Sequence, residues 1–449
     1  MRIPFLDKYL KGEQRSVTVK KNILASFVIK GVSILISFLL VPATLGYVSA
    51  ELYGVWMALS SVLLWVQFLD LGFSQGLKNK LAEALAFKDY EKGKALVSTT
   101  YAMVALIFVP VGIILEFIVP LVDWCDLLNV SSEYADEIER VMYVLVAFAC
   151  IQMIVNVLTS VIAAFQKVAF ASVFSVIGQI LAFIIIIVLT KTTPPSLLGL
   201  ALSYAATPVL VLIVASVILY NTRFKIVAPE FRKIDRSHIK ELFDLGYKFF
   251  IINVQVVVLY YMTNILISHV SSPLQVTSYN LAYKYLNVAM MVYSLMTAPL
   301  WPAYTDAYAK KDYDWMKTTL SKMTKIMFMS IGICAVMVFV SPVIYNIWFG
   351  DKADVPFTMT LIVAIYTCTY CWMNLNGTVV VGMGTVSLQT IINIIGMVVH
   401  IPLSLFLGKH IGAYGVIVSM ILINLFYAIF FKVQVTKVLS GKATGIWLK

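Results

Sequence analysis

Charged residues are scarce in this chain. Only 13% of its 449 residues are Asp, Glu, Lys or Arg, whereas 61% are hydrophobic. Soluble globular domains average about 25% charged and about 45–50% apolar residues. The shortage of charge therefore excludes a soluble globular protein and indicates a polytopic membrane protein. The polar, basic stretch 1–21 precedes an apolar run long enough to span, so we predict no separate secretory signal.

Motifs that carry enzymatic chemistry are also missing. The sequence has no GxxxxGK[ST] phosphate loop, no HExxH zinc motif, no credible Ser-His-Asp order and no large soluble segment to house an active site. Its five cysteines suggest no disulfide framework. Cys368 and Cys371 form a CxxC inside an apolar run with no second pair, which packing explains better than a metal or redox site. We predict a protein that is no enzyme, holds no cofactor, and draws any energy input from a proton or sodium gradient or from substrate concentration.

Twelve apolar runs are long enough to cross a membrane as helices, which takes roughly 20 residues. Outer-membrane strands would instead alternate over pieces of about 10 residues, so we predict an all-α integral membrane protein with 12 transmembrane helices. Prolines inside the runs, such as Pro42, Pro110 and Pro402, are predicted to kink these helices and not to end them. The runs are 22–45, 52–73, 95–119, 141–163, 170–189, 197–219, 247–270, 276–300, 324–348, 357–381, 386–407 and 413–433.

The positions of lysine and arginine predict the orientation, because these residues favour cytoplasmic loops. With the N-terminus inside, 28 of the 34 basic residues lie in cytoplasmic segments and four lie in outer loops. Both termini are therefore predicted to be cytoplasmic. The net charge of +11 follows from this topology. It suits contact with anionic lipid of the inner leaflet and does not indicate nucleic-acid binding.

A short segment of the sequence recurs at half the chain length. Residues 83–90 (EALAFKDY) return as residues 306–313 (DAYAKKDY), an offset of 223 in a chain of 449. Each copy lies between the second and third predicted helices of a six-helix half, and an even number of helices gives both halves the same orientation. We predict two parallel lobes, 1–219 and 247–449, joined by a basic cytoplasmic linker at 220–246. The alternative for the motif alone is a generic amphipathic loop helix.

Two lysines lie deep in predicted transmembrane helices. Lys30 and Lys284 are each about nine residues from a membrane face, which is ~13 Å at the helical rise per residue. A charge at that depth costs ~2.5 kcal/mol or more, so it persists where it faces a wet cavity or a partner. We predict that both lysines line a substrate cavity and attract an anionic group. The alternative is a snorkelling side chain or a hydrogen bond between helices.

Further polar residues are candidates for substrate contacts, gating or ion coupling. The predicted substrate contacts are Asn253, Asn264 and Tyr283, which would meet sugar hydroxyls or sugar faces, although such groups also hold helices together. A histidine titrates near neutral pH and can carry a proton, and cytoplasmic carboxylates can close a gate. Interfacial capping or a satisfied core position is the alternative for each. The predicted gate or coupling residues are Asp70, Glu116, His269, Asp306 and His400.

Three segments carry a family resemblance. They are 45–56 (Leu-Gly-Tyr, then Leu-Tyr-Gly-Val-Trp), 69–77 (Leu-Asp-Leu-Gly-Phe, then Gly-Leu) and 279–304 (Tyr-Asn-Leu-Ala-Tyr-Lys, then Pro-Leu-Trp-Pro-Ala-Tyr). Together they resemble the polysaccharide (O-antigen type) flippases of the multidrug/oligosaccharidyl-lipid/polysaccharide exporter superfamily. The resemblance implies two facing six-helix lobes that move undecaprenyl-diphosphate-linked oligosaccharide across a bacterial inner membrane by alternating access. Lys30 and Lys284 would face the diphosphate or acidic sugars, but they are not equivalent positions of the two halves.

The expected partners follow from the same resemblance. They are the lipid-linked oligosaccharide, membrane lipids, a polysaccharide polymerase and glycosyltransferases. An ion-coupled multidrug exporter of this architecture stays open as an alternative, although its cavity would favour acidic residues over lysines. A membrane glycan transferase or polymerase also stays open, although it would need large outer loops, and the longest one, 120–140, holds a single arginine. A non-transporting scaffold is the remaining alternative.

Overall fold

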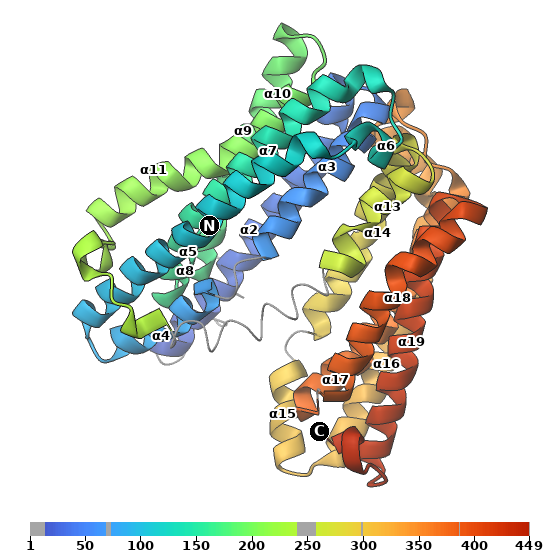
Figure 1. Cartoon of the computed structure of the whole chain (residues 1–449). Coiled ribbons are helices and arrows are strands. Elements are labelled where there is room, and N and C mark those ends of the chain that lie inside the picture. The colour runs from blue at the N-terminus through green and yellow to red at the C-terminus, as the bar shows by residue number, and fades with distance from the viewer. Residues whose placement is uncertain (1–13, 69–72, 240–256, 298–299, 386, 449) are drawn as a thin grey trace, which may run out of the picture. The chain divides into compact units, whose positions relative to one another are not determined.

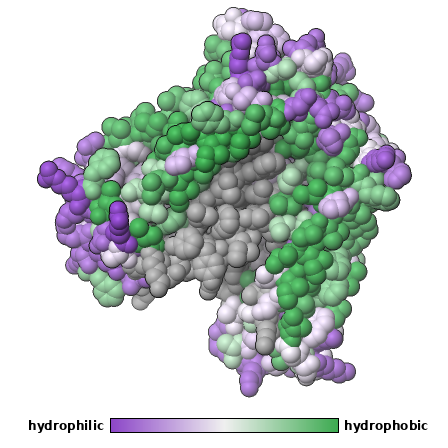
Figure 2. Space-filling model, in the orientation of Figure 1, coloured by the Kyte–Doolittle hydropathy of each residue, from purple (hydrophilic) through white to green (hydrophobic). Residues whose placement is uncertain are grey.

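The computed structural model describes residues 14–68, 73–239, 257–297, 300–385 and 387–448. All regular elements in these ranges are helices (Figure 1). Nine of the described helices are long and apolar enough to cross a membrane, and α3 and α14 occupy two further predicted spans. Hydrophobic side chains cover the flanks of the helices, and hydrophilic ones gather at their ends (Figure 2). The predicted all-α membrane fold is confirmed for the described residues.

The chain divides into two compact units, and unit 1 is the described part of Met1–Ser49, Leu59–Cys125 and Ser131–Val254. Its core holds fully buried side chains such as Leu81, Val97 and Phe224. In Figure 1 its helices run from blue to green. They are α2 (Gln14–Tyr47), α4 (Phe73–Ala86), α5 (Tyr90–Ile118), α7 (Ala135–Val155), α8 (Val157–Ala164), α9 (Val168–Thr192), α10 (Leu197–Ala201) and α11 (Thr207–Asn221), with most of α3 (Ala50–Phe68).

Unit 2 is the described part of Gln255–Lys449 with two short pieces, Ala50–Ala58 at the start of α3 and Asp126–Val130 after the beginning of α6 (Trp124–Leu128). Its core includes the buried side chains of Tyr304, Val379 and Val435. Its main helices run from yellow to red in Figure 1. They are α13 (Thr263–Val270), α14 (Pro273–Thr297), α15 (Leu300–Ala309), α16 (Tyr313–Trp348), α17 (Phe357–Met383), α18 (Ser387–Ile411) and α19 (Ala413–Leu439).

Two predicted spans contain a local irregularity. Span 141–163 divides into α7 and α8 at Asn156, whose main-chain and side-chain oxygens both accept from Thr159 Oγ1, at 2.7 and 3.1 Å. Such local bonds compete with helical pairing. Span 197–219 contains a π-turn just before Pro208, where the wider turn relieves the clash of the proline ring with the preceding turn. Other prolines lie inside continuous helices as predicted, namely Pro42, Pro110, Pro342 and Pro402.

Both copies of the repeated segment fold into the same corner between two helices. Lys88 and Lys311 take left-handed conformations with φ of 58° and 57°. The next residue caps the following helix in each copy, since Asp89 accepts from the backbone N–H of Lys92, and Asp312 from that of Trp315, both at 3.0 Å. The bonds from the aspartate N–H to the carbonyls of Ala84 and Ala307 repeat as well, at 2.9 Å each. These matching corners favour a duplication over a generic loop helix.

The shared corner predicts matched effects of capping mutations. Asp89→Ala and Asp312→Ala are each expected to lower the free energy of unfolding by about 1 kcal/mol, because each leaves an N-terminal N–H without its acceptor. Thermal unfolding of the purified protein in detergent measures the change. Asp314→Ala is the control, since Asp314 lies in the same first turn but forms only an exposed pair with Lys317 at 3.7 Å. Equal losses in all three variants would contradict the capping role.

Candidate functional site

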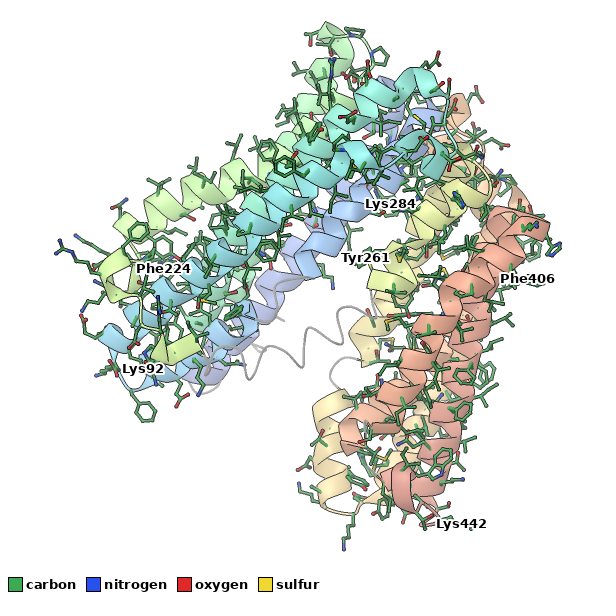
Figure 3. All side chains as sticks on the ribbon, in the orientation of Figure 1. Lys92, Phe224, Tyr261, Lys284, Phe406 and Lys442 are labelled. Carbon is green, nitrogen blue, oxygen red and sulfur yellow. The ribbon has the colours of Figure 1, made fainter. Side chains whose placement is uncertain are left out.

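One face of α14 is polar and half-exposed. Asn280, Tyr283, Lys284 and Asn287 follow the spacing that places side chains on one side of a helix, and all four are partly exposed. The opposite face packs into unit 2, where Leu286 is fully buried. Figure 3 labels Lys284 on this helix. A helix with one buried apolar face and one half-exposed face carrying a lysine can line a polar site.

Five tyrosines of unit 2 form a continuous group of rings beside Lys284, which we call the tyrosine cluster. The rings of Tyr279 and Tyr283 are stacked at 24° with centroids 5.8 Å apart. The ring centroids of Tyr283 and Tyr366 are 6.2 Å apart, and those of Tyr366 and Tyr370 are 6.4 Å apart. The Tyr370 ring packs edge-on against that of Tyr260, with centroids 6.1 Å apart. Tyr283, Tyr260 and Tyr370 are half-buried, so part of the cluster is accessible. Each ring offers an apolar face and a hydroxyl, which are the features that a sugar ring can use.

Tyr283 stands out in the sequence as a candidate, whereas its neighbours on α17 do not. Tyr366 and Tyr370 lie in a long apolar run, where aromatic residues are ordinary packing elements. Their spacing of four residues places them on one face of a helix, and this is the only signal that could have found them. The partner rings come from α14 and from the single turn of π-helix at Val257–Tyr261. Only the packing of these three elements brings the rings together.

Asn264 holds helices together in this structure. Its Nδ2 donates to the carbonyl of Met57 at 3.1 Å, and its Oδ1 accepts from Nδ2 of Asn280 at 2.9 Å. The amide therefore connects α13 with the beginning of α3 and with α14, all within unit 2. Because both ends of the amide are engaged, the contacts fit the helix-joining alternative better than direct contact with a sugar.

Lys30 lies on an exposed apolar surface of α2. Its neighbours Val28, Val32 and Leu35 are exposed as well, and a Cβ added at Gly31 would meet no atom within 4 Å. Lys30 forms no ion pair with any residue that the structure describes. One turn further along, Ser33 Oγ donates to Gln179 Oε1 at 2.8 Å and ties α2 to α9. The predicted role of Lys30 in a substrate cavity stays a prediction.

Asp306 belongs to an exposed ion pair at the repeated corner. Lys310 Nζ lies 2.7 Å from its Oδ2, and both side chains are mostly exposed. The equivalent position in the first half is Glu83, which pairs with Lys80 at 3.3 Å. Surface pairs of this kind contribute roughly 0–1 kcal/mol. Both copies thus carry an exposed ion pair, although the two lysines are not at equivalent positions, and the predicted gate role of Asp306 stays a prediction.

His400 is enclosed within unit 2. Its Nδ1 lies 3.1 Å from Ser419 Oγ and 3.3 Å from Ser404 Oγ, and all three residues are fully buried between α18 and α19. Its Nε2 has no hydrogen-bond partner among the described residues. A buried polar nitrogen left unpaired costs free energy, but the same burial disfavours the charged form of the ring. The coupling role of His400 therefore stays a prediction.

The remaining predicted gate or coupling residues lie at helix ends or outside the described ranges. Glu116 is half-buried in the last turn of α5, and His269 is exposed in the last turn of α13. Asp70 and Asn253 lie outside the described residues. Within unit 2, Lys284 and Tyr283 share a face of α14 with Asn280, which bonds to Asn264. The functional roles of all these residues, and of Glu116 and His269, stay predictions.

Sequence comparisons identify two related families. The sequence model of a family described as polysaccharide biosynthesis protein matches residues 19–308, which is more than half of the chain. The model of a second family, MatE, matches residues 249–406. A search of curated proteins finds no match.

Solved structures share the fold over nearly the whole chain. An inward-facing multidrug resistance MATE family transporter of the MOP superfamily has a TM-score of 0.77 at 14% identity, covering 93% of this chain and 98% of its own. An outward-facing transporter of the same description has a TM-score of 0.63 at 15% identity, covering 99% and 100%. A MOP superfamily transporter from Pyrococcus furiosus Vc1, described with a reversed binding-pocket polarity that suggests a different function, has a TM-score of 0.64 at 14% identity, covering 99% and 100%. The chain therefore has the fold of these transporters.

Proposed function

The chain belongs to the polysaccharide biosynthesis protein family, and on this premise we propose that it flips an undecaprenyl-diphosphate-linked oligosaccharide from the inner to the outer leaflet of a bacterial inner membrane. The observation that carries the proposal is the half-buried Lys284 beside the tyrosine cluster on the polar face of α14. An ammonium there can meet a phosphate, and neighbouring tyrosines can meet sugar rings. The family match supports a substrate that contains both.

The physical problem of such transport explains the residue types. A diphosphate and several sugars cannot cross hydrocarbon, whereas the lipid tail can stay in it. A cation within a membrane helix is costly and is retained where it meets an anion or water. Lys284 supplies this cation, and the hydroxyls and rings of the tyrosine cluster replace water around the sugars. In this scheme Lys30, which is exposed on α2, is proposed as a cation that the first half of the chain offers to the substrate.

Switching between the two leaflets needs an energy source and a conformational change. The chain offers His400 as a group that could take up a proton, since its Nδ1 contacts two serines and its Nε2 has no hydrogen-bond partner in the part of the chain that the structure describes. A histidine changes charge near neutral pH in water, which makes it suited to coupling. In this scheme the two halves of the chain provide alternating access. The carboxylates predicted to be cytoplasmic, including Asp306, are the gate candidates.

An ion-coupled multidrug exporter is the second candidate. The MatE match and the shared fold with multidrug transporters favour it. A cationic drug, however, would be repelled by Lys284 and drawn to a carboxylate. The Pyrococcus furiosus transporter, described with a pocket of reversed polarity, supports the view that pocket charge differs within this fold. The lysine therefore favours an anionic substrate.

The test is glycan export in cells in which this chain is the only candidate flippase. We expect the chain to restore surface glycan and to remove lipid-linked oligosaccharide from the inner leaflet, with no change in resistance to cationic drugs. Both readouts come from the same cells, and a strain carrying an empty vector is the control. Drug resistance without glycan export would assign the multidrug function instead. A change in glycan length with purified protein and lipid-linked oligosaccharide would assign a polymerase.

A further inference from the structure

The loop after α11 is fastened to α5 of unit 1. Lys94 Nζ on α5 donates to Glu230 Oε1 at 2.7 Å, and the Glu230 N–H donates to Ser98 Oγ at 2.9 Å. The Asp235 N–H donates to Thr99 Oγ1 at 3.0 Å. The described part of the predicted linker, 220–239, is therefore bound to one unit.

A cavity of about 310 Å³ lies where this loop meets α5 and α7. This volume is at the lower end of the ~300–1,000 Å³ typical of small-molecule sites. It is lined mainly by apolar groups from three elements, among them Ala102, Ala105, Ile154, Phe231 and Ile234. The loop side chains are exposed, so the cavity opens at the surface.

The polar groups in the cavity wall already have partners. Ser98 Oγ donates to the carbonyl of Lys94 and accepts from Glu230, and the Tyr101 hydroxyl lies 3.1 Å from that of Tyr220. The Glu230 carboxylate pairs with Lys94. A polar ligand would therefore find few free partners inside, whereas an apolar chain would lose none by entering. The occupant that this wall suits is apolar.

The surroundings of the cavity are those of a protein at a bilayer interface. Phe231 is 95% exposed and Ile234 is 41% exposed on the loop. On α5, just beyond the cavity, Leu106 and Val109 are 66% and 51% exposed, as expected for a flank in contact with lipid. An exposed phenylalanine among basic residues is typical of a segment that lies in the headgroup region. In that position lipid would have direct access to the cavity. In Figure 3 Lys92 and Phe224 mark this end of unit 1.

The loop keeps an excess of positive charge at the cavity mouth. Residues 221–239 hold five basic and two acidic side chains. Lys233 Nζ donates to Glu91 Oε2 at 2.5 Å. This hydrogen bond holds the pKa of the Lys233 ammonium above its usual range. Arg232 and Arg236 form no ion pair with any residue that the structure describes. Guanidinium groups recognise phosphate with two parallel hydrogen bonds, so these arginines suit a phosphate headgroup.

We propose that the cavity holds one acyl chain of an anionic phospholipid, with the phosphate bound by Arg232 and Arg236. The lipid would seal the loop against α5 and belongs to the leaflet that the loop faces. This lipid site is independent of the transported substrate. It predicts that anionic lipid binds more tightly than zwitterionic lipid of the same chain length.

The test uses the full chain in nanodiscs with trace phosphatidylglycerol that carries a photoreactive group on its acyl chain. Cross-links mapped by mass spectrometry are expected on the peptides around Ala102, Ala105 and Ile154. Unlabelled phosphatidylglycerol should compete with the probe and phosphatidylcholine should not. Ala105→Phe fills the cavity and is expected to lower labelling on the order of tenfold, the effect of excluding about two methylene groups.

Matched variants separate the cavity from the charge. Ile113→Phe also places a phenylalanine on α5, but on its lipid-exposed flank, and should label as the wild type does. Arg232→Gln with Arg236→Gln should weaken phosphatidylglycerol competition by about fivefold per arginine. Arg223→Gln with Lys225→Gln removes the same charge elsewhere on the loop and should not.

The cross-link positions test the acyl-chain site, and the lipid competition tests the headgroup site. Cross-links confined to other surfaces, or wild-type labelling in a folded Ala105→Phe protein, would overturn the acyl-chain site. Equal competition by the two lipids would overturn the anionic headgroup. Thermal unfolding verifies that each variant is folded. If the Ala105→Phe protein does not fold, Ala102→Leu replaces it as a smaller substitution that also fills the cavity. Glycan export is measured separately, so loss of the lipid site and failure of the flippase function are distinguishable.

Discussion

Replacing Lys284 by alanine is expected to lower glycan export by roughly 10- to 150-fold at matched expression. A hydrogen bond to a charged group contributes about 1.5–3 kcal/mol, and each 1.36 kcal/mol corresponds to a factor of ten in rate. Lys284 is half-buried on the same face of α14 as Tyr283, where a hydrogen bond to a phosphate is less weakened by water than at the surface. Surface glycan and inner-leaflet lipid-linked oligosaccharide, measured in the same cells, report the change.

Two further substitutions sharpen this prediction. Lys284→Arg keeps the charge and should restore part of the export, because a guanidinium can also meet a phosphate. Lys30→Ala should lower export less than Lys284→Ala, because Lys30 is exposed on α2 and its loss leaves no buried partner. Lys325→Ala removes an exposed lysine of α16 and is the control. Normal export in Lys284→Ala would make that lysine structural, even if the chain remains a flippase.

A methyl group at Gly54 is expected to destabilise the protein by about 3 kcal/mol, the upper end of the range for overpacking. The new Cβ would overlap the carbonyl oxygen of Pro273 and lie 2.8 Å from Thr277 Oγ1. Thr277 also donates to the carbonyl of Ala50 at 2.5 Å, so the start of α3 lies directly against the start of α14. Backbone cannot move aside as a flexible side chain can. The expected result is a lower unfolding temperature in detergent and less folded protein.

A second glycine provides the matched control. A Cβ at Gly332 on α16 would meet no atom within 4 Å, so Gly332→Ala should leave the unfolding temperature unchanged or raise it, since alanine favours a helix. Because Gly54 contacts the helix that carries Lys284, Gly54→Ala should also lower export per folded molecule. A Gly54→Ala protein as stable as the wild type would show that the two helices do not pack this closely.

Much of the fold could be predicted because it depends on local composition. Hydropathy over about 20 residues identified the spans, and the structure places helices in the ranges it describes. The repeat was readable because Lys88-Asp89-Tyr90 and Lys311-Asp312-Tyr313 carry the turn and the cap in three adjacent residues. The cytoplasmic orientation of the termini rests on charge alone and remains a prediction.

The candidate site was predictable only in part. Lys284 and Tyr283 stood out because polar groups are rare in an apolar helix. Tyr366 and Tyr370 did not, since tyrosines in an apolar run usually indicate packing, and only α14 beside α17 turns them into a cluster. Asn264 was predicted to contact substrate, yet its amide is shared between Met57 and Asn280. No local pattern reveals such partners, because they are distant in the sequence.

The sequence by itself determined the membrane class, the positions of the spans, the internal repeat and the family. These follow from hydropathy, charge and short capping motifs, which act within a few turns of chain. Only the tertiary structure decided which polar groups are satisfied, that the loop 221–239 lies on α5, and that an apolar cavity forms beneath it. Those features depend on atomic shape at contacts between distant segments, and Gly54 is another such contact, where an added Cβ would overlap the backbone of Pro273.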